Sequence, residues 1–155
     1  MERETQSDIS DEPLSITRES LFDLLCDNAS YVMMLGDAAL ADTPLTNASS
    51  GLLITVDQYP GVTVAELARQ IPKSAQTIGQ VLNRLVKLGY VERRLGVGRG
   101  IHLYATTAGQ EMAKQAAERE DSVEMRLQDL VGGRDRYELL RNLLLQARAA
   151  FQEGS

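Results

Sequence analysis

The segment 61–108 constrains the fold most, because helix start and stop signals follow one another closely along it. The run Thr63-Val64-Ala65-Glu66 has the spacing of a capping box, in which threonine and glutamate satisfy free backbone N–H groups of a new helix. Pro72 disfavours helical geometry in the residue before it. Ser74 is a suitable N-cap for a second helix, and Gly89 ends that helix. The order predicts two helices joined by a tight turn, 63–70 and 74–88.

Two short runs rich in strand-favouring residues follow, and they flank the tip Gly96-Val97-Gly98-Arg99-Gly100. Three glycines in five positions permit the positive φ angles of a tight or bulged hairpin. Residues 61–108 hold seven basic and two acidic side chains, so their net charge is +5, whereas the whole chain is −6 and the remainder is −11. A helix-turn-helix followed by a basic hairpin, with strands over 90–95 and 101–106, is typical of a winged helix-turn-helix.

Outside this segment the chain is predicted to be helical after an acidic, mobile tail over 1–13. From about Ser15 to Ala41, apolar residues recur at helical spacing in two adjacent stripes, which make one wide face that we expect to be buried. The stripes are Phe22, Cys26, Ala29, Met33 and Leu40, beside Leu21, Leu25, Val32, Leu35 and Ala39. The other predicted helices are 47–58 with Thr46 as its cap, 107–131 opened by a Thr107/Gln110 capping box, and 134–151 with Tyr137, Leu140, Leu144, Ala147 and Phe151 on one face.

The predicted fold class is therefore mainly α (α+β), a winged helix-turn-helix lobe over 46–107 between long helical regions over 14–45 and 108–155. One cysteine cannot form an internal disulfide. No apolar run approaches the roughly 20 residues that span a bilayer, and the first residues lack the basic and apolar stretches of a signal peptide. We expect a cytoplasmic protein.

The predicted helix 74–88 has one apolar and one polar face. Its apolar residues fall at helical spacing and are expected in the core: Ile78, Val81, Leu82, Leu85 and Leu88. The opposite face carries amide, hydroxyl and basic groups, which are the groups that read base edges in the major groove. A recognition helix usually enters the groove with its N-terminal end. We expect base readout from Ser74, Ala75, Gln76, Thr77 and Gln80, and phosphate or base contact from Arg84 and Lys87. The alternative is a polar face that only meets solvent.

Arg93 and Arg94 alternate faces of the predicted hairpin strand, so we expect one to meet phosphate and the other a carboxylate. Arg99 lies at the tip between two glycines, where it can enter a minor groove whose narrow A·T tracts concentrate negative potential. An exposed basic hairpin without a nucleic-acid role is the alternative. Gly79 costs its helix about 1 kcal/mol relative to alanine; close approach to the preceding helix or to DNA would explain it, and so would slight fraying.

Three runs resemble the MarR family of bacterial transcription regulators: 63–68, 85–93 and 106–109. The resemblance is clearest from about Thr46 to Gln110 and extends over most of 15–151. It implies a homodimer whose terminal helices form the interface and whose recognition helix and wing contact a pseudopalindromic site in double-stranded DNA, usually as a repressor released by a small molecule or an oxidant. The family's wing often carries an Asp-x-Arg signature. Arg99 matches the arginine, but the acidic position is lost in a short Gly-Val-Gly run.

In the proteins that it resembles, effectors bind between the first two helices and the DNA-binding lobe. Residues here that suit an aromatic or amphipathic ligand in such a pocket are Asn28, Tyr31, Met34, Ser49, Ser50 and Tyr59, with plain core or dimer packing as the alternative. Some family members sense peroxides through a cysteine in this first helix. A sensing cysteine needs a lowered pKa and solvent access, whereas Asp23 and Asp27 disfavour a thiolate at Cys26 and its stripe is apolar. We expect a structural cysteine, with redox sensing as the alternative.

An enzymatic role has little support in the sequence. His102 is the only histidine, and no second histidine or nucleophile pair offers a metal set or a catalytic pair. We expect no cofactor and no metal, and a phosphate-contacting or merely exposed role for His102. A winged-helix module whose basic surface binds an acidic protein is the alternative from another class. Among regulators, the alternative is a ligand-independent activator.

Overall fold

The structure, a computed structural model, describes residues 19–96 and 100–154. These residues form six helices and one two-stranded antiparallel sheet. None of the described helices is both long enough and apolar enough to cross a membrane. The elements in chain order are α1 (Leu21–Ala39), α2 (Asn47–Gln58), α3 (Val64–Gln70), α4 (Ala75–Lys87), β1 (Val91–Leu95), β2 (Ile101–Ala105), α5 (Thr107–Leu130) and α6 (Arg134–Glu153).

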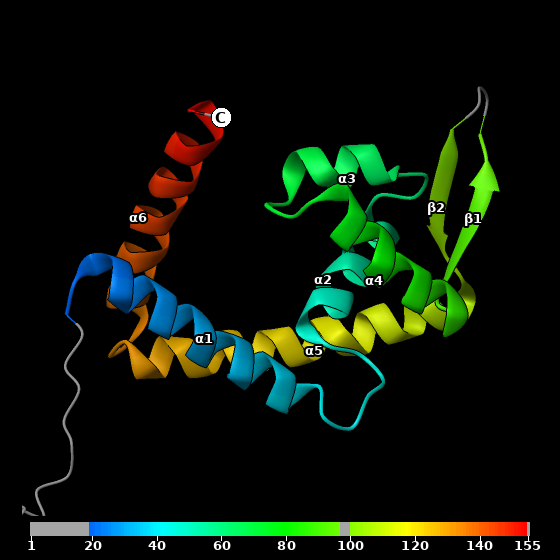
Figure 1. Cartoon of the computed structure of the whole chain (residues 1–155). Helices are drawn as coiled ribbons and strands as arrows, with labels where there is room; N and C mark the ends of the chain where they lie inside the picture. Colours follow the sequence, from blue (N-terminus) through cyan, green and yellow to red (C-terminus); the bar gives the residue numbers. More distant parts are fainter. Residues whose placement is uncertain (1–18, 97–99, 155) are drawn as a thin grey trace, which may run out of the picture.

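Helix α5 is the long axis around which the other elements are arranged (Figure 1). Helix α2 and strand β2 pack against α5 near its N-terminal end, and α1 packs along its remaining length. Helix α6 rises from the C-terminal end of α5, far from the two strands (Figure 1). The molecule therefore has a lobe of α2, α3, α4 and the hairpin at one end of α5, and a helical region at the other.

The hydrophobic core lies in this winged-helix lobe. Helices α2, α4 and strand β2 contribute its largest fully buried side chains, and α5 adds two small residues that let it pack closely. The strands pair in a single register from Val91↔Ala105 to Leu95↔Ile101. The mainly α winged helix-turn-helix predicted from the sequence is confirmed. Core side chains with no exposed surface include Leu53, Val56, Ile78, Leu82, Leu85, Leu103 and Ala116.

Three predicted helix caps are confirmed. Each side-chain hydroxyl accepts a hydrogen bond from the backbone N–H three residues later, which satisfies one of the free donors of the first turn. In α3 the box is reciprocal, because the Thr63 N–H also donates to the Glu66 carboxylate at 2.8 Å. The confirmed caps are Thr46 of α2, Thr63 of α3 and Ser74 of α4.

The predicted cap of α5 is wrong by one residue. Thr106, rather than Thr107, is the N-cap, with extended backbone angles and a side chain that accepts from the Gly109 N–H at 3.0 Å. The Thr106 hydroxyl also donates to the Gly89 carbonyl at 2.6 Å. This second bond crosses from β2 to the end of α4, so the choice between two adjacent threonines depends on tertiary structure.

The prediction for α1 is wrong at its start and in its burial. Ser20 is extended and caps Leu21–Ala39, so the helix does not begin at Ser15. The wide apolar face is mostly exposed in the single chain, because α5 covers only part of it. Within the fully described helices α1 and α6, Gly36 alone is buried. Exposed apolar side chains include Leu21, Phe22, Leu25, Val32 and Met33 of α1, and Leu139, Leu140, Leu143 and Leu144 of α6.

Candidate nucleic-acid interface

Helix α4 presents a polar face to solvent because its apolar residues follow helical spacing. Ile78, Leu82 and Leu85 are fully buried and fix the orientation of the helix in the lobe. Val81 is half-buried as expected for the edge of this face, whereas Leu88, predicted to be core, is 38% exposed as the C-cap. The residues predicted to point outward are all exposed: Gln76, Thr77, Gln80, Asn83, Arg84 and Lys87.

The N-terminal end of α4 carries two kinds of polar side chain: some form the helix cap, and others are available to a ligand. The Ser74 hydroxyl accepts from the Thr77 N–H at 3.1 Å and shares a hydrogen bond with the Thr77 hydroxyl at 2.9 Å. Both hydroxyls are therefore engaged with each other. Within the described part of the chain, the amides of Gln76 and Gln80 have no hydrogen-bond partner. They are the donors and acceptors of this end that remain available, and Ala75 beside them is exposed.

The hairpin is joined to α4 by a hydrogen bond that the sequence did not predict. Arg93 of β1 donates from Nη2 to Asn83 Oδ1 of α4 at 2.7 Å, and both side chains are exposed. The contact directs one guanidinium nitrogen of Arg93 to α4 and places this basic group where α4 and the hairpin meet. The sequence shows an outward amide at Asn83 and a strand arginine ten residues later at Arg93. Their spacing alone does not predict that the two side chains form a hydrogen bond.

Arg94 lies on the other face of β1 and meets a carboxylate, as expected for one of the two arginines. Its guanidinium pairs with Glu92 and lies 4.4 Å from the centroid of the Tyr104 ring. Ion pairing and stacking on an aromatic face both restrict the arginine. Of the pair, Arg93 is therefore the one that is not paired with a carboxylate of the described chain, and its phosphate contact stays a prediction.

The other three predicted basic DNA contacts have different outcomes in the structure. Arg84 donates to the carbonyl oxygen of Pro44 at 3.1 Å, so it ties α4 to the loop between α1 and α2. Lys87 is exposed at the last turn of α4. Arg99 lies outside the described residues.

His102 is not merely an exposed residue, whereas its expected phosphate contact stays a prediction. Its side chain is half-buried, and Nδ1 lies 2.6 Å from the carbonyl oxygen of Gly61. A carbonyl oxygen can only accept, so Nδ1 carries the hydrogen of this bond. The described residues hold no group of three or more histidine, cysteine or acidic side chains able to bind a metal ion.

Two cavities lie along the helical region. One of about 710 Å³ is bounded by α1, the end of α5 and α6, and one of about 670 Å³ lies between α1 and α5. Of the predicted ligand residues, Asn28, Tyr31 and Met34 line the smaller cavity, together with Arg126. Their grouping with the other three is wrong. The buried hydroxyls of Ser49 and Ser50 bond to α2 or α5, and Tyr59 is 63% exposed and lines neither cavity.

Cys26 is exposed in the single chain, so the expectation that it is a buried structural cysteine is wrong for the single chain.

Two groups of the described chain, Glu66 and Tyr137, have shifted pKa values. The Thr63 backbone N–H and hydroxyl hold the pKa of Glu66 below its ordinary value by hydrogen bonding to its carboxylate. The hydrogen bond to Glu124 raises the pKa of Tyr137, because the phenol donates to a carboxylate there.

Comparison with known proteins shows a similarity to one family of regulators. The MarR family model matches residues 43–99, a range that contains α2, α3, α4 and β1. The MarR-family protein Rv2887 of Mycobacterium tuberculosis, solved with p-aminosalicylic acid, is 27% identical with a TM-score of 0.66, and the match covers 83% of this chain and 98% of that one. A crystal structure of MarR is 25% identical with a TM-score of 0.75, covering 91% and 99%.

The fold is also shared with a more distant regulator. SlyA is 18% identical with a TM-score of 0.76, and the match covers 86% of this chain and 95% of SlyA. No curated protein sequence matches this chain. The family match spans the elements that build the exposed face of α4 and the arginines of β1. Residues 43–99 thus match the MarR family model, and most of the chain shares the fold of solved MarR-family winged-helix regulators.

Proposed function

We propose that this MarR-family regulator is a homodimeric repressor that binds a pseudopalindromic operator and is released by a small-molecule effector. The observation that carries the proposal is the unengaged amide face of α4 beside Arg93, which Asn83 holds at the junction of helix and wing. Gln side chains pair with adenine edges in the major groove. Two recognition helices of a dimer would enter successive major grooves about 34–36 Å apart.

The DNA contacts divide into base-reading and phosphate-positioning groups. Gln76 and Gln80 project from the end of α4 that enters the groove, whereas Arg93 and Lys87 supply positive charge beside it. Phosphate contacts give affinity that falls steeply with salt, and base contacts give specificity. Ser74 and Thr77 support the geometry through their mutual bonds, and Ala75 offers only its methyl group and backbone.

Dimerisation is supported by the exposed apolar surface of α1 and α6. Soluble monomers rarely expose large contiguous apolar patches, yet the large cavity between α1, α5 and α6 is lined mainly by leucine and valine. A second copy of the chain would cover this surface and bring two recognition helices into one complex. The regions 14–45 and 108–155 are thus assigned to dimerisation, and 46–107 to DNA binding.

The effector is proposed to be an aromatic carboxylate or a similar amphipathic molecule. The cavity between α1 and α5 combines the ring of Tyr31, the flexible side chain of Met34 and the guanidinium of Arg126. Arginine recognises carboxylates with paired donors. The related Mycobacterium tuberculosis protein has been solved with p-aminosalicylic acid and with salicylic acid, which have this chemistry.

Selection of bound sequences from random duplex DNA tests the operator proposal, and screening of aromatic acids against the selected site tests release. Gln76→Ala and Gln80→Ala should each weaken operator binding by about tenfold and relax the preference at one base pair, because a base contact contributes ~1–3 kcal/mol of discrimination. Gln110→Ala on the exposed first turn of α5 is the matched amide control and should have no effect.

Some outcomes would reject this assignment. Unchanged specific binding in Gln76→Ala, Gln80→Ala and Arg99→Ala would show that the surface is placed wrongly. A module that binds an acidic protein would yield no enriched palindrome at all. Transcription from the selected operator, measured with and without the protein, separates repression from activation.

A further inference from the structure

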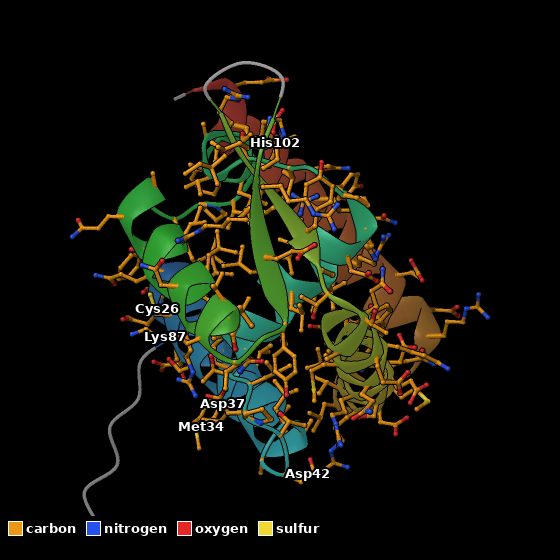
Figure 2. The ribbon with its side chains drawn as sticks, turned by 90° about the vertical axis from the view of Figure 1, so that its right-hand side faces the viewer. Cys26, Met34, Asp37, Asp42, Lys87 and His102 are labelled. Atoms are coloured by element: carbon orange, nitrogen blue, oxygen red, sulfur yellow. The ribbon has the colours of Figure 1, made fainter. Side chains whose placement is uncertain are left out.

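His102 occupies a position in the wing that no DNA contact explains. It lies in β2 opposite Arg94, near the outer end of the hairpin, whereas Met34 of α1 and Asp42 of the following loop lie at the opposite end of the molecule in this view (Figure 2). Its Nδ1–H donates to the Gly61 carbonyl at 2.6 Å, across a sequence separation of 41 residues. The imidazole therefore bridges the wing and the turn between α2 and α3.

The turn that receives this hydrogen bond is itself fixed to β2. The Gly61 N–H donates to the Leu103 carbonyl at 2.8 Å, and the Leu103 N–H donates to the Val62 carbonyl at 3.0 Å. Gly61 has φ +88°, and a Cβ there would lie 3.1 Å from the Tyr104 hydroxyl oxygen. Residues 61 and 62 thus extend the sheet edge, and the Gly61 carbonyl is a rigid anchor for the imidazole.

The same ring supports the backbone at the outer end of the hairpin. A Cβ at Gly96 would lie 2.1 Å from both Cδ2 and Nε2 of His102, and a Cβ at Gly100 would lie 3.5 Å from Nε2. The Gly96 N–H donates to the Gly100 carbonyl at 3.0 Å, which closes the hairpin just above the ring. Glycine at 96 is therefore required by the position of the imidazole.

We propose that His102 is a positioning residue for DNA binding: the Nδ1–H bond to Gly61 and the packing of the ring under Gly96 set the angle of the wing to α4. The wing departs from the family's Asp-x-Arg pattern, because Arg99 has no acidic residue at the matching position. The hydrogen bond from His102 to Gly61 holds the wing instead. A wing already held in its bound orientation loses less conformational freedom on binding. The inference rests on the proposed role of the wing as a DNA contact.

Three substitutions at His102 separate the hydrogen bond from simple packing. The amide nitrogen of asparagine can occupy the place of Nδ1, whereas that of glutamine occupies the place of Nε2. His102→Asn should therefore retain operator affinity within about twofold, and His102→Gln and His102→Leu should weaken it by about tenfold, a change of about 1.4 kcal/mol. Affinity is measured by fluorescence anisotropy on the full-length protein, and hydroxyl-radical footprints should lose protection only at the flanks.

Thermal unfolding of each variant shows whether the lobe still folds. Equal affinities for His102→Asn and His102→Gln, at unchanged melting temperature, would overturn the proposal, because the position of the donor would then not matter. So would a loss of protection across the whole site, since that would indicate a damaged recognition helix instead of a displaced wing.

A double-mutant cycle tests the contact between the ring and Gly96 independently. Gly96→Ala should weaken operator binding by about tenfold when histidine is present, because its Cβ would collide with the imidazole. In the His102→Ala background the same change should have little further effect, since the colliding ring is gone. Additive effects of the two substitutions would contradict the proposed contact.

The failure of this inference can be distinguished from the failure of the proposed DNA-binding surface. Arg93→Ala tests the wing as a contact without touching His102, Gly61 or Gly96. If Arg93→Ala leaves operator affinity unchanged and the flanks unprotected, the wing does not contact DNA and the proposed surface is wrong. If Arg93→Ala weakens binding but His102→Gln does not, only the positioning role is wrong.

Discussion

Gly79 lies inside the recognition helix, where a glycine weakens the element and no turn requires it. Apart from its chain neighbours and the backbone of its own helix, no heavy atom of the described chain lies within 4 Å of the Cβ that another residue would carry there. Close packing on the preceding helix is therefore excluded as its explanation. The helix is continuous from Ala75 to Lys87, so fraying at Gly79 is not seen either. Close approach to DNA stays a prediction.

Gly79→Ala should raise the free energy of unfolding by up to about 1 kcal/mol, because alanine has the higher helix propensity and the space is open. Chemical denaturation measures this change. The operator affinity of the same variant then reports on DNA: a loss of affinity at increased stability indicates that the backbone at Gly79 approaches the duplex. A loss of stability would contradict the open environment found here.

Glu66 makes the stability of α3 depend on pH. The Thr63 N–H and hydroxyl stabilise its carboxylate and lower its pKa from 4.5 in the folded state. The stability contributed by a lowered pKa is fully present above the unfolded value and is lost as the pH falls through the folded value. The loss therefore belongs to the acid range below pH 4.5.

Glu66→Gln should reduce the slope of unfolding free energy against pH in that acid range, because the amide oxygen can still accept from Thr63 without titrating. Denaturation at a series of pH values provides the measurement. Glu111→Gln, at an exposed position on α5, is the control. An unchanged acid slope in Glu66→Gln would show that this cap is not a source of the pH dependence.

At the scale of elements, Thr106 links three of them. It caps α5, follows β2 directly and donates to the carbonyl of Gly89 at the end of α4. Gly109 in the first turn of α5 also fits closely against β1, because a Cβ there would lie 1.9 Å from the Tyr90 carbonyl oxygen. The wing is thus fixed at its base by the start of α5, and at its outer end by His102.

Thr106→Ala should lower the free energy of unfolding by about 1–2 kcal/mol, since an N-cap typically contributes this much and the bond to Gly89 is lost as well. Thr107→Ala is the matched control and should change stability far less, because the exposed Thr107 side chain is not the cap. Equal effects of the two substitutions in urea denaturation would contradict the observed cap.

At the scale of the molecule, the single chain leaves a large apolar surface of α1 and α6 exposed. Helix α6 has no buried residue, and much of the apolar face of α1 is exposed. These faces lie at the end of α5 remote from the wing (Figure 1). A partner bound there leaves the recognition surface accessible, which is the arrangement that a dimeric DNA-binding protein needs.

Leu144→Glu should convert the proposed dimer to a monomer and weaken operator binding by at least about tenfold, because it puts a charge on the apolar surface of α6. Sedimentation velocity measures the mass, and anisotropy measures binding. Gln146→Glu adds the same charge two residues away, outside the cavity lining, and should leave both unchanged. A Leu144→Glu protein that remains dimeric would place the interface elsewhere.

Helix caps and helix faces follow from the amino-acid sequence alone, because they depend on residues that are close together along the chain. The caps at Thr46, Thr63 and Ser74 and the exposed polar face of α4 were predicted, because capping bonds span three residues and helical periodicity repeats every turn. The turn glycine after α4 follows the same logic, since Gly89 has φ +76°.

Tertiary structure decided everything that depends on residues distant in the chain. Thr106 rather than Thr107 is the cap, because the Thr106 hydroxyl also donates to the Gly89 carbonyl. Arg93 bonds to Asn83, and His102 bonds to Gly61, only because the fold brings these residues together. It also left the apolar face of α1 uncovered, although its periodicity indicated burial. Periodicity tells which side of a helix is apolar, but only the packing of the other elements decides whether the same chain or a second copy covers that side.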